Sequence, residues 1–322
     1  MYDLSLSGES SSRVSIEDTY ESHCYTPDSP EYPDQLSLLN KPPKELYHLG
    51  QPIKLLKAPI VAVVGSRKAT RYGLTIARSL GRGLAQRGIS VCSGLALGID
   101  GACHRGVIDE MQSGTGSGPP IGVLGHGWGK LHPRQHRELA LAVMRHGTLF
   151  TEYAPGSPAS RYTFPARNRI IAALSDHVVI VEAGARSGSL HTAEFALDLG
   201  KTVWAVPNGI GSPNSQGVLT LIKEGAQALV NVEEFLESIA PSKRPRKRET
   251  WPPLSSDEQH LLVSLADNDG QLDHVCESLD WSATELAYRL TGLELQGLVG
   301  RAIDGTWQVL CWELVRKLKQ KI

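Results

Sequence analysis

Glycine, serine and arginine recur in this sequence directly after short apolar runs. Gly65, Ser66 and Arg67 follow the run IVAVV, and Ser93 and Gly94 follow the run ISVC. Glycine lets the backbone approach an anion closely, serine donates a hydroxyl hydrogen bond, and an arginine guanidinium can donate two parallel bonds to one phosphate. These residue types suit phosphate binding, although a tight turn explains Gly65, Ser66 and Arg67 about equally well.

The densest such segment is FPARNRI, at residues 164–170. Arg167, Asn168 and Arg169 open an apolar helical stretch, and a helix N-terminus attracts anions because its first backbone amides lack partners. Phe164 supplies an aromatic face on which a nucleobase can stack. The alternative is a surface helix start beside a core phenylalanine. Two arginines, a helix start and an aromatic ring together predict a nucleic-acid contact.

A further segment of small residues precedes another helical stretch. Ser187, Gly188 and Ser189 follow Arg186 there, and backbone amides in such a turn can cradle a phosphate. In an open α/β sheet, ligands bind at the carboxyl ends of the strands. We therefore predict that these segments meet at one sheet edge and form a rim that binds a polyanion.

The sequence lacks the motifs of several enzyme classes. It has no G-x-S-x-G elbow, no HExxH pair and no Walker lysine loop, and the glycines after IVAVV do not have dinucleotide-fingerprint spacing. His126, His132 and His136 lie close in sequence, but no carboxylate accompanies them at metal-ligand spacing. Asp100 is expected to cap a helix, with a structural role for His104 four residues later. We expect no catalytic residue, no metal and no cofactor.

Apolar runs alternate with helical patterns from residue 60 to residue 224. Strands are predicted at 60–64, 89–92, 121–124, 148–153, 177–183 and 202–207, and helices at 72–87, 134–146, 166–174, 189–199 and 216–224. Continuous β-branched runs are typical of strands that are buried on both faces. The alternation predicts an α/β fold with a parallel, doubly wound sheet.

Composition divides the chain into five predicted parts. They are a disordered acidic tail at 1–31, the sheet domain at 32–240, a proline-broken basic linker at 241–254, a small unit at 255–315 and a basic tail at 316–322. The small unit begins with a Ser/Asp helix cap, and its last third predicts a hairpin that turns at Asp304 and Gly305. Helices followed by a hairpin are typical of a winged-helix module.

Charge is unevenly distributed along the 322 residues, although the net charge is −1. Residues 35–240 carry +7 and residues 251–315 carry −9, so the middle of the chain is the part that could meet phosphate. Scattered surface cations are the simpler alternative. No apolar run approaches the roughly 18 residues that a membrane span needs. The five cysteines form no CxxC pair, which predicts a cytoplasmic protein without a disulfide framework.

Several long motifs, in this order, resemble the DNA-processing protein A family (DprA, also called Smf). They are GSR from Gly65, SGLALGIDGACH, GHGWGKLHPRQHREL, FPARNRIIAALS, VEAGARSGSLHTAEFAL and VPNGI. The similarity covers about residues 32–239 and, more loosely, 257–312. It implies an extended Rossmann-like fold, a C-terminal winged helix and a homodimer. It also implies that the protein binds single-stranded DNA and loads the RecA recombinase during natural transformation, without enzymatic activity.

The resemblance further implies the residues of the DNA pocket. They are Gly65, Ser66, Arg67, Ser93, Gly94, Phe164, Arg167, Asn168, Arg169, Ser187, Gly188 and Ser189. The sequence departs from the family at the residue before Pro133, which is His132 instead of tyrosine, and at Asn208, where glycine is usual. Residues 1–31 are too short and too polar to supply the N-terminal helical domain of many relatives.

Two other functions are compatible with parts of the sequence. One is a nucleotide phosphoribohydrolase of the lysine-decarboxylase-like (LOG) group, whose PGGxGTxxE loop needs a glutamate three residues after its threonine. Here Thr192 is followed by Glu194 at plus two and by Phe195 at plus three, which disfavours that enzyme. The other is a regulator that binds DNA through its winged helix, and the acidic balance of residues 251–315 disfavours it.

Overall fold

The structure is a computed structural model that describes residues 22–52, 59–129, 131–241, 251–268, 270–301 and 306–320. The chain divides into two compact units, Met1–Ser242 and Lys243–Ile322. Each unit has its own hydrophobic core. The predicted disorder of residues 1–21 and the basic run at 242–250 fall outside the described residues.

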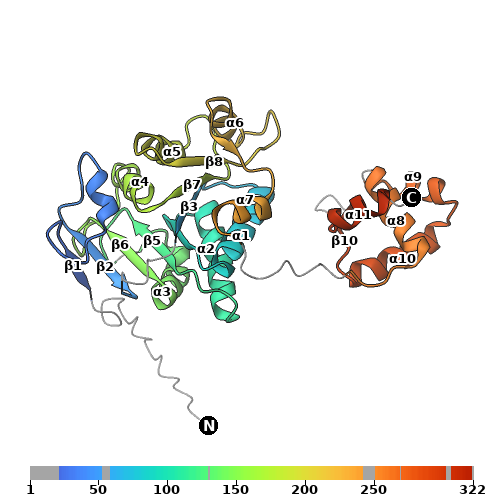
Figure 1. Cartoon of the computed structure of the whole chain (residues 1–322), viewed down its shortest axis with the longest axis horizontal. Coiled ribbons are helices and arrows are strands. Elements are labelled where there is room, and N and C mark those ends of the chain that lie inside the picture. The colour runs from blue at the N-terminus through green and yellow to red at the C-terminus, as the bar shows by residue number, and fades with distance from the viewer. Residues whose placement is uncertain are drawn as a thin grey trace, which may run out of the picture. The chain divides into compact units, whose positions relative to one another are not determined.

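The described part of the first unit forms a nine-stranded sheet with the order β1-β2-β6-β5-β4-β3-β7-β8-β9 (Figure 1). The strands from β6 to β9 in this order are parallel to one another. At the β6 edge, β2 pairs antiparallel with β6, and β1 pairs antiparallel with β2. The bounds are β1 (His23–Tyr25), β2 (Leu46–Gly50), β3 (Ile60–Val64), β4 (Ser90–Ser93), β5 (Pro120–Leu124), β6 (Thr148–Thr151), β7 (His177–Ile180), β8 (Thr202–Ala205) and β9 (Gln227–Ala228). The prediction of a mostly parallel α/β sheet is confirmed.

Helices cover both faces of this sheet (Figure 1). Val61 and Val63 of β3 pack in one core cluster with α1, α2 and α7, whereas Ala62 and Val64 pack in a second cluster with α4, α5 and α6. Both faces of β3 are therefore buried, as its continuous β-branched run predicts. The helices are α1 (Arg71–Gln86), α2 (Ile99–Gln112), α3 (Arg137–His146), α4 (Thr163–Leu174), α5 (Ser189–Asp198), α6 (Gln216–Lys223) and α7 (Val232–Ile239), with short 3-10 turns at Asp34–Leu38 and Arg134–His136.

The strand order places a switch point between β3 and β7. From β3 the chain winds outward through β4, β5 and β6 on one side, and from β7 it winds outward through β8 and β9 on the other. The chain therefore leaves the carboxyl ends of β3 and β7 in opposite directions. Doubly wound sheets bind their ligands in the crevice that this divergence opens.

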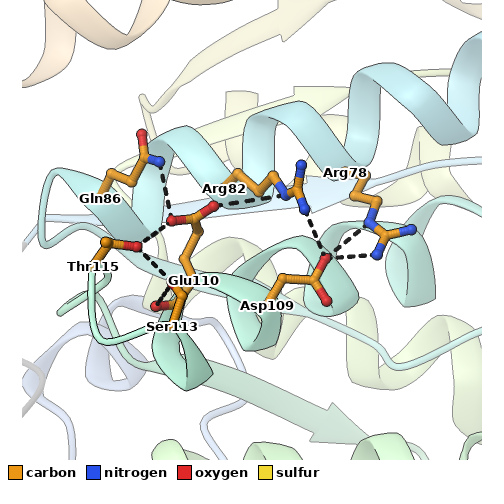
Figure 2. Close-up of polar contacts among 7 residues, drawn as sticks. All are labelled: Arg78, Arg82, Gln86, Asp109, Glu110, Ser113 and Thr115. Carbon is orange, nitrogen blue, oxygen red and sulfur yellow. Dashed lines mark hydrogen bonds and ion pairs between the residues drawn. The ribbon is translucent and has the colours of Figure 1, made fainter. Parts of the chain in front are cut away.

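Helices α1 and α2 cross closely beside this crevice because glycine lies at their contact. A Cβ atom added at Gly106 would lie 2.2 Å from the carbonyl oxygen of Arg78, so a larger residue does not fit. Figure 2 shows Arg78 and Arg82 of α1 reaching Asp109 of α2, at 2.7 and 3.4 Å. Exposed ion pairs of this kind contribute about 0–1 kcal/mol each. Close packing, more than charge, thus fixes α2, whose first turn borders the crevice.

The second unit has the predicted winged-helix organisation. Its elements are α8 (Ser256–Asp267), α9 (Leu272–Leu279), α10 (Ala283–Leu295), β10 (Val299–Arg301), β11 (Trp307–Val309) and α11 (Trp312–Lys319). The Ser255 side chain caps α8 and forms a reciprocal capping box with Glu258. Strands β10 and β11 pair antiparallel, and the predicted turn residues Asp304 and Gly305 lie outside the described residues.

Some boundaries predicted from composition were wrong. Residues 23–25, assigned to a disordered tail, form β1 and pair with β2. Trp251 and Leu254, assigned to the linker, pack against the core of the second unit. The supposed basic tail begins inside α11, and Leu318 is buried in that core. In each case a few apolar residues in a polar stretch find a partner that lies far away in the sequence.

Candidate nucleic-acid interface

A cavity of about 510 Å³ lies at the switch point of the sheet. Its walls come from the loop after β3, the first turn of α2, the start of α4 and the turn before α5. It thus unites segments that lie more than 100 positions apart in the sequence. The predicted site residues in its lining are Gly65, Ser66, Arg67, Phe164, Arg167, Asn168, Ser187, Gly188 and Ser189.

Exposed cations surround the cavity. Arg67, Lys68, Arg161 and Arg186 are exposed and belong to its lining, and within the described ranges no ion pair joins any of them to an acidic residue. The acidic residue in the lining is Asp100, which is buried. The cavity is therefore positive at its mouth. Lys68, Arg161 and Arg186 were missing from the predicted set because isolated surface cations occur all along the chain.

Planar side chains gather around three residues of the cavity lining, Arg67, Arg161 and Phe164. The Arg67 guanidinium lies over the Phe164 ring, 5.1 Å from its centroid, and the His132 ring lies 5.6 Å from the same centroid. Arg161 lies 4.7 Å over the ring of Tyr162, which is 68% exposed. The Phe164 ring is thus partly covered, and Arg67 offers a base both a charge and a flat surface.

The opposite wall is the turn that leads into α5. Asn168 donates a hydrogen bond of 3.0 Å from Nδ2 to the Gly188 carbonyl, which ties α4 to this turn. The hydroxyls of Ser187 and Ser189 are 2.8 Å apart. Helix α5 begins at Ser189, so the positive end of its dipole borders the cavity.

Arg167 forms the cavity floor, and its contacts are structural. It is 4% exposed, and its guanidinium donates hydrogen bonds to the carbonyls of Gly94 and Val123. The Asp100 carboxylate accepts a 3.0 Å bond from the Gly94 amide. Burial raises the pKa of Asp100, and the nearby Arg167 charge opposes that rise. The predicted capping role of Asp100 was wrong, because the N-cap of α2 is Gly98, with a φ of 79°.

Comparison with known proteins identifies the family. The model of the DNA recombination-mediator protein A family matches residues 23–240, and that of the DprA winged helix domain matches residues 245–305. This chain belongs to the DNA recombination-mediator protein A family. The Smf protein of Escherichia coli is 36% identical over 296 residues, which cover 88% of this chain and 76% of that protein. The DprA protein of Bacillus subtilis is 35% identical over a region that covers 66% of this chain and 69% of that protein.

Solved structures of family members share the fold. DprA from Streptococcus pneumoniae superposes with a TM-score of 0.62 at 35% identity, over 68% of this chain and 75% of that one. DprA from Helicobacter pylori superposes with a TM-score of 0.61 at 28% identity, over 68% of this chain and 95% of that one. The H. pylori structure concerns the single-stranded DNA binding mode of that protein. The predicted Rossmann-like fold and family membership are thereby confirmed.

Three predicted site residues lie outside the cavity lining of this DprA-family chain. Ser93 is buried, and its hydroxyl donates a 2.7 Å bond to the Val63 carbonyl. Gly94 borders a smaller hollow beside the cavity. Arg169 forms an ion pair with Glu152, whose pKa is raised by burial and lowered in part by this arginine. Two residues span about 200° of an α-helix, so Arg167 and Arg169 point to different sides of α4.

Of the two residues that the phosphoribohydrolase alternative concerns, only one lies in the cavity lining. Thr192 lines the cavity, but Glu194 is exposed and pairs with His191 at 2.9 Å. Within the described ranges, no group of three or more His, Cys, Asp or Glu side chains is arranged to hold a metal ion. No helix in that part of the chain is long and apolar enough to cross a membrane.

Acid is expected to destabilise the first unit through His104 on α2. Burial lowers the pKa of His104 to about 3, and the charge of His136 acts in the same direction. The native state keeps this imidazole neutral, whereas the unfolded chain binds a proton below pH 6.5, so stability falls as pH drops from 6.5 toward 3. At pH 5 this group alone is expected to cost about 2 kcal/mol.

Urea denaturation of the wild type and of His104→Leu between pH 7 and pH 4.5 tests this expectation. The variant should lose less stability than the wild type over that interval, whatever its stability at pH 7. Equal pH dependence in the two proteins would show that His104 does not supply the effect.

Proposed function

We propose that this chain binds single-stranded DNA in the cavity at the switch point and acts as a recombination mediator. The observation that carries this proposal is the set of four exposed cations around one cavity, each without an acidic partner in the described part of the chain. A volume of about 510 Å³ lies within the range of small-ligand sites and suits nucleotide units of a strand.

The arrangement suits an unpaired strand better than a duplex. Arg67, Lys68, Arg161 and Arg186 would neutralise consecutive phosphates, and the Arg67–Phe164 stack would meet an unstacked base. A duplex keeps its bases paired inside, so it could use only the charges. We assign the binding role to these four cations and to Gly65, Ser66, Phe164, Asn168, Ser187, Gly188 and Ser189, with Arg167 supporting the floor.

The finer part of the proposal follows the family. We infer a cytoplasmic homodimer that protects incoming single strands and loads RecA onto them during natural transformation, without catalysing a reaction. Membership of the recombination-mediator family supports this role. The position of Glu194, exposed and paired with His191, gives the phosphoribohydrolase alternative no support.

Fluorescence anisotropy with a labelled oligo-dT strand and a matching duplex, titrated at several salt concentrations, tests the proposal. We expect tight binding of the strand with a steep salt dependence and much weaker binding of the duplex. Equal affinities for strand and duplex would contradict it, and AMP hydrolysis would then be measured. RecA filament assembly on strands coated by a single-strand-binding protein tests the loading role.

A further inference from the structure

Glu182, the second residue after β7, is a buried carboxylate at the edge of the proposed DNA site. It is 0% exposed, and no ion pair joins it to a basic residue within the described ranges. A buried charge of this kind is costly unless hydrogen bonds satisfy it. Its presence beside a site for a polyanion therefore needs a structural reason.

Four donors from two loops satisfy this carboxylate. It accepts bonds from the Thr70 amide at 2.9 Å and from the Thr70 hydroxyl. It also accepts bonds from the side-chain amides of Asn214 at 3.3 Å and Asn208 at 3.4 Å. Thr70 is the N-cap of α1, and the two asparagines lie in the loop after β8. One carboxylate thus joins the exits of β3, β7 and β8.

The fit of α1 over the carboxylate is close. A Cβ atom at Gly73 would lie 2.4 Å from the carboxyl carbon of Glu182, so a larger residue at this position would displace the carboxylate. The Glu182 carbonyl also accepts a 2.8 Å bond from the Ser66 amide. Both ends of the loop that carries Arg67 and Lys68 are therefore held by Glu182.

The same contacts extend into the cavity lining. Asn214 donates a 2.7 Å bond to the Lys68 carbonyl, and its side-chain oxygen lies 3.3 Å from the Ser66 hydroxyl. That hydroxyl accepts a 3.2 Å bond from the Lys68 amide. Ser66, Lys68 and Asn214 all line the cavity, whereas Glu182 does not.

We propose that Glu182 is a positioning residue for single-stranded DNA: through Thr70, Asn208 and Asn214 it fixes the loops that present Ser66, Arg67 and Lys68 to the strand. The inference rests on the proposed function. Electrostatics alone predicts the opposite sign, because a negative charge near phosphates repels DNA and its removal should tighten binding. The direction of the change in affinity therefore separates the two explanations.

The experiment measures oligo-dT affinity of the full chain carrying Glu182→Gln, Asn214→Ala or both. Glutamine introduces a donor where Thr70 and the asparagines already donate, so the loops should shift and affinity should fall about 5- to 10-fold. The double variant should bind no more weakly than the weaker single variant, because both changes break one network. Asp109→Asn removes one negative charge on the α1–α2 surface and should leave affinity unchanged (Figure 2).

Unchanged or tighter binding by Glu182→Gln, or additive losses in the double variant, would overturn the inference. Thermal unfolding checks that each variant is folded at the assay temperature. If Glu182→Gln does not fold, Asn208→Ala replaces it, since it removes one donor to Glu182 outside the cavity lining and should weaken binding about twofold. A wild type without single-strand binding would instead refute the proposed function. A third outcome would refute this inference alone. In that case the wild type binds the strand and Arg67→Ala weakens binding, but the Glu182 and Asn208 variants bind as tightly as the wild type.

Discussion

Replacement of Arg67 by alanine is expected to weaken single-stranded DNA binding about 10- to 100-fold. The guanidinium is exposed at the cavity mouth and stacked on Phe164, so its loss removes a phosphate partner and a planar surface for a base. Charge-assisted hydrogen bonds of this kind are worth about 1.5–3 kcal/mol. The slope of log affinity against log salt should become shallower by about 0.7, the value for one phosphate contact on a single strand.

Anisotropy titrations with oligo-dT at several salt concentrations measure both quantities. Arg78→Ala is the matched control, because Arg78 is also an exposed arginine but pairs with Asp109 on the α1–α2 surface (Figure 2). It should change neither affinity nor slope beyond the effect of net charge. If the Arg67 and Arg78 variants have the same affinity and the same salt slope, Arg67 does not belong to the DNA site.

Replacement of Arg167 by methionine is expected to cost about 2–6 kcal/mol of stability in the first unit, because each of two buried carbonyls left without a donor costs about 1–3 kcal/mol. The change leaves the carbonyls of Gly94 and Val123 without these donors and leaves buried Asp100 without its nearby positive charge. Calorimetry of the full chain measures the effect, and the winged-helix unit provides an internal control because its core is separate.

The DNA affinity of the same variant decides between two roles for Arg167. A floor residue should affect DNA less than Arg67→Ala does, once the protein is compared below its unfolding temperature. If Arg167→Met melts like the wild type yet binds DNA as poorly as Arg67→Ala, then Arg167 contacts the strand directly, as the sequence alone suggests.

The fold could be predicted from local patterns. Runs such as IVAVV have no polar position, so they fit only strands covered on both faces, and the helical stretches between them require parallel crossovers. The predictions failed where a short apolar element depends on a distant partner. Strand β1 has three residues and exists because it pairs with β2, and α11 is held by apolar side chains, Leu318 among them, that are buried in the core of the second unit.

The site could be predicted only in part. The sequence placed glycine, serine and arginine at strand exits, and most of these residues do meet in one cavity. It could not distinguish Arg167 from Arg169, which occupy the same motif but turn to different sides of α4. Nor could it find Glu182, because a lone glutamate after a strand carries no local signal until Thr70, Asn208 and Asn214 surround it.

The sequence by itself determined the order of the elements, the two units and the kinds of side chain available at the sheet edge, because these follow from local periodicity and residue type. Only the tertiary structure decided which cations face the cavity and which are neutralised or buried. An arginine is available to bind an anion or serves as a structural tie according to its solvation and nearest partners. Arg67 remains exposed, Arg167 is desolvated against carbonyls, and Arg169 is paired with Glu152.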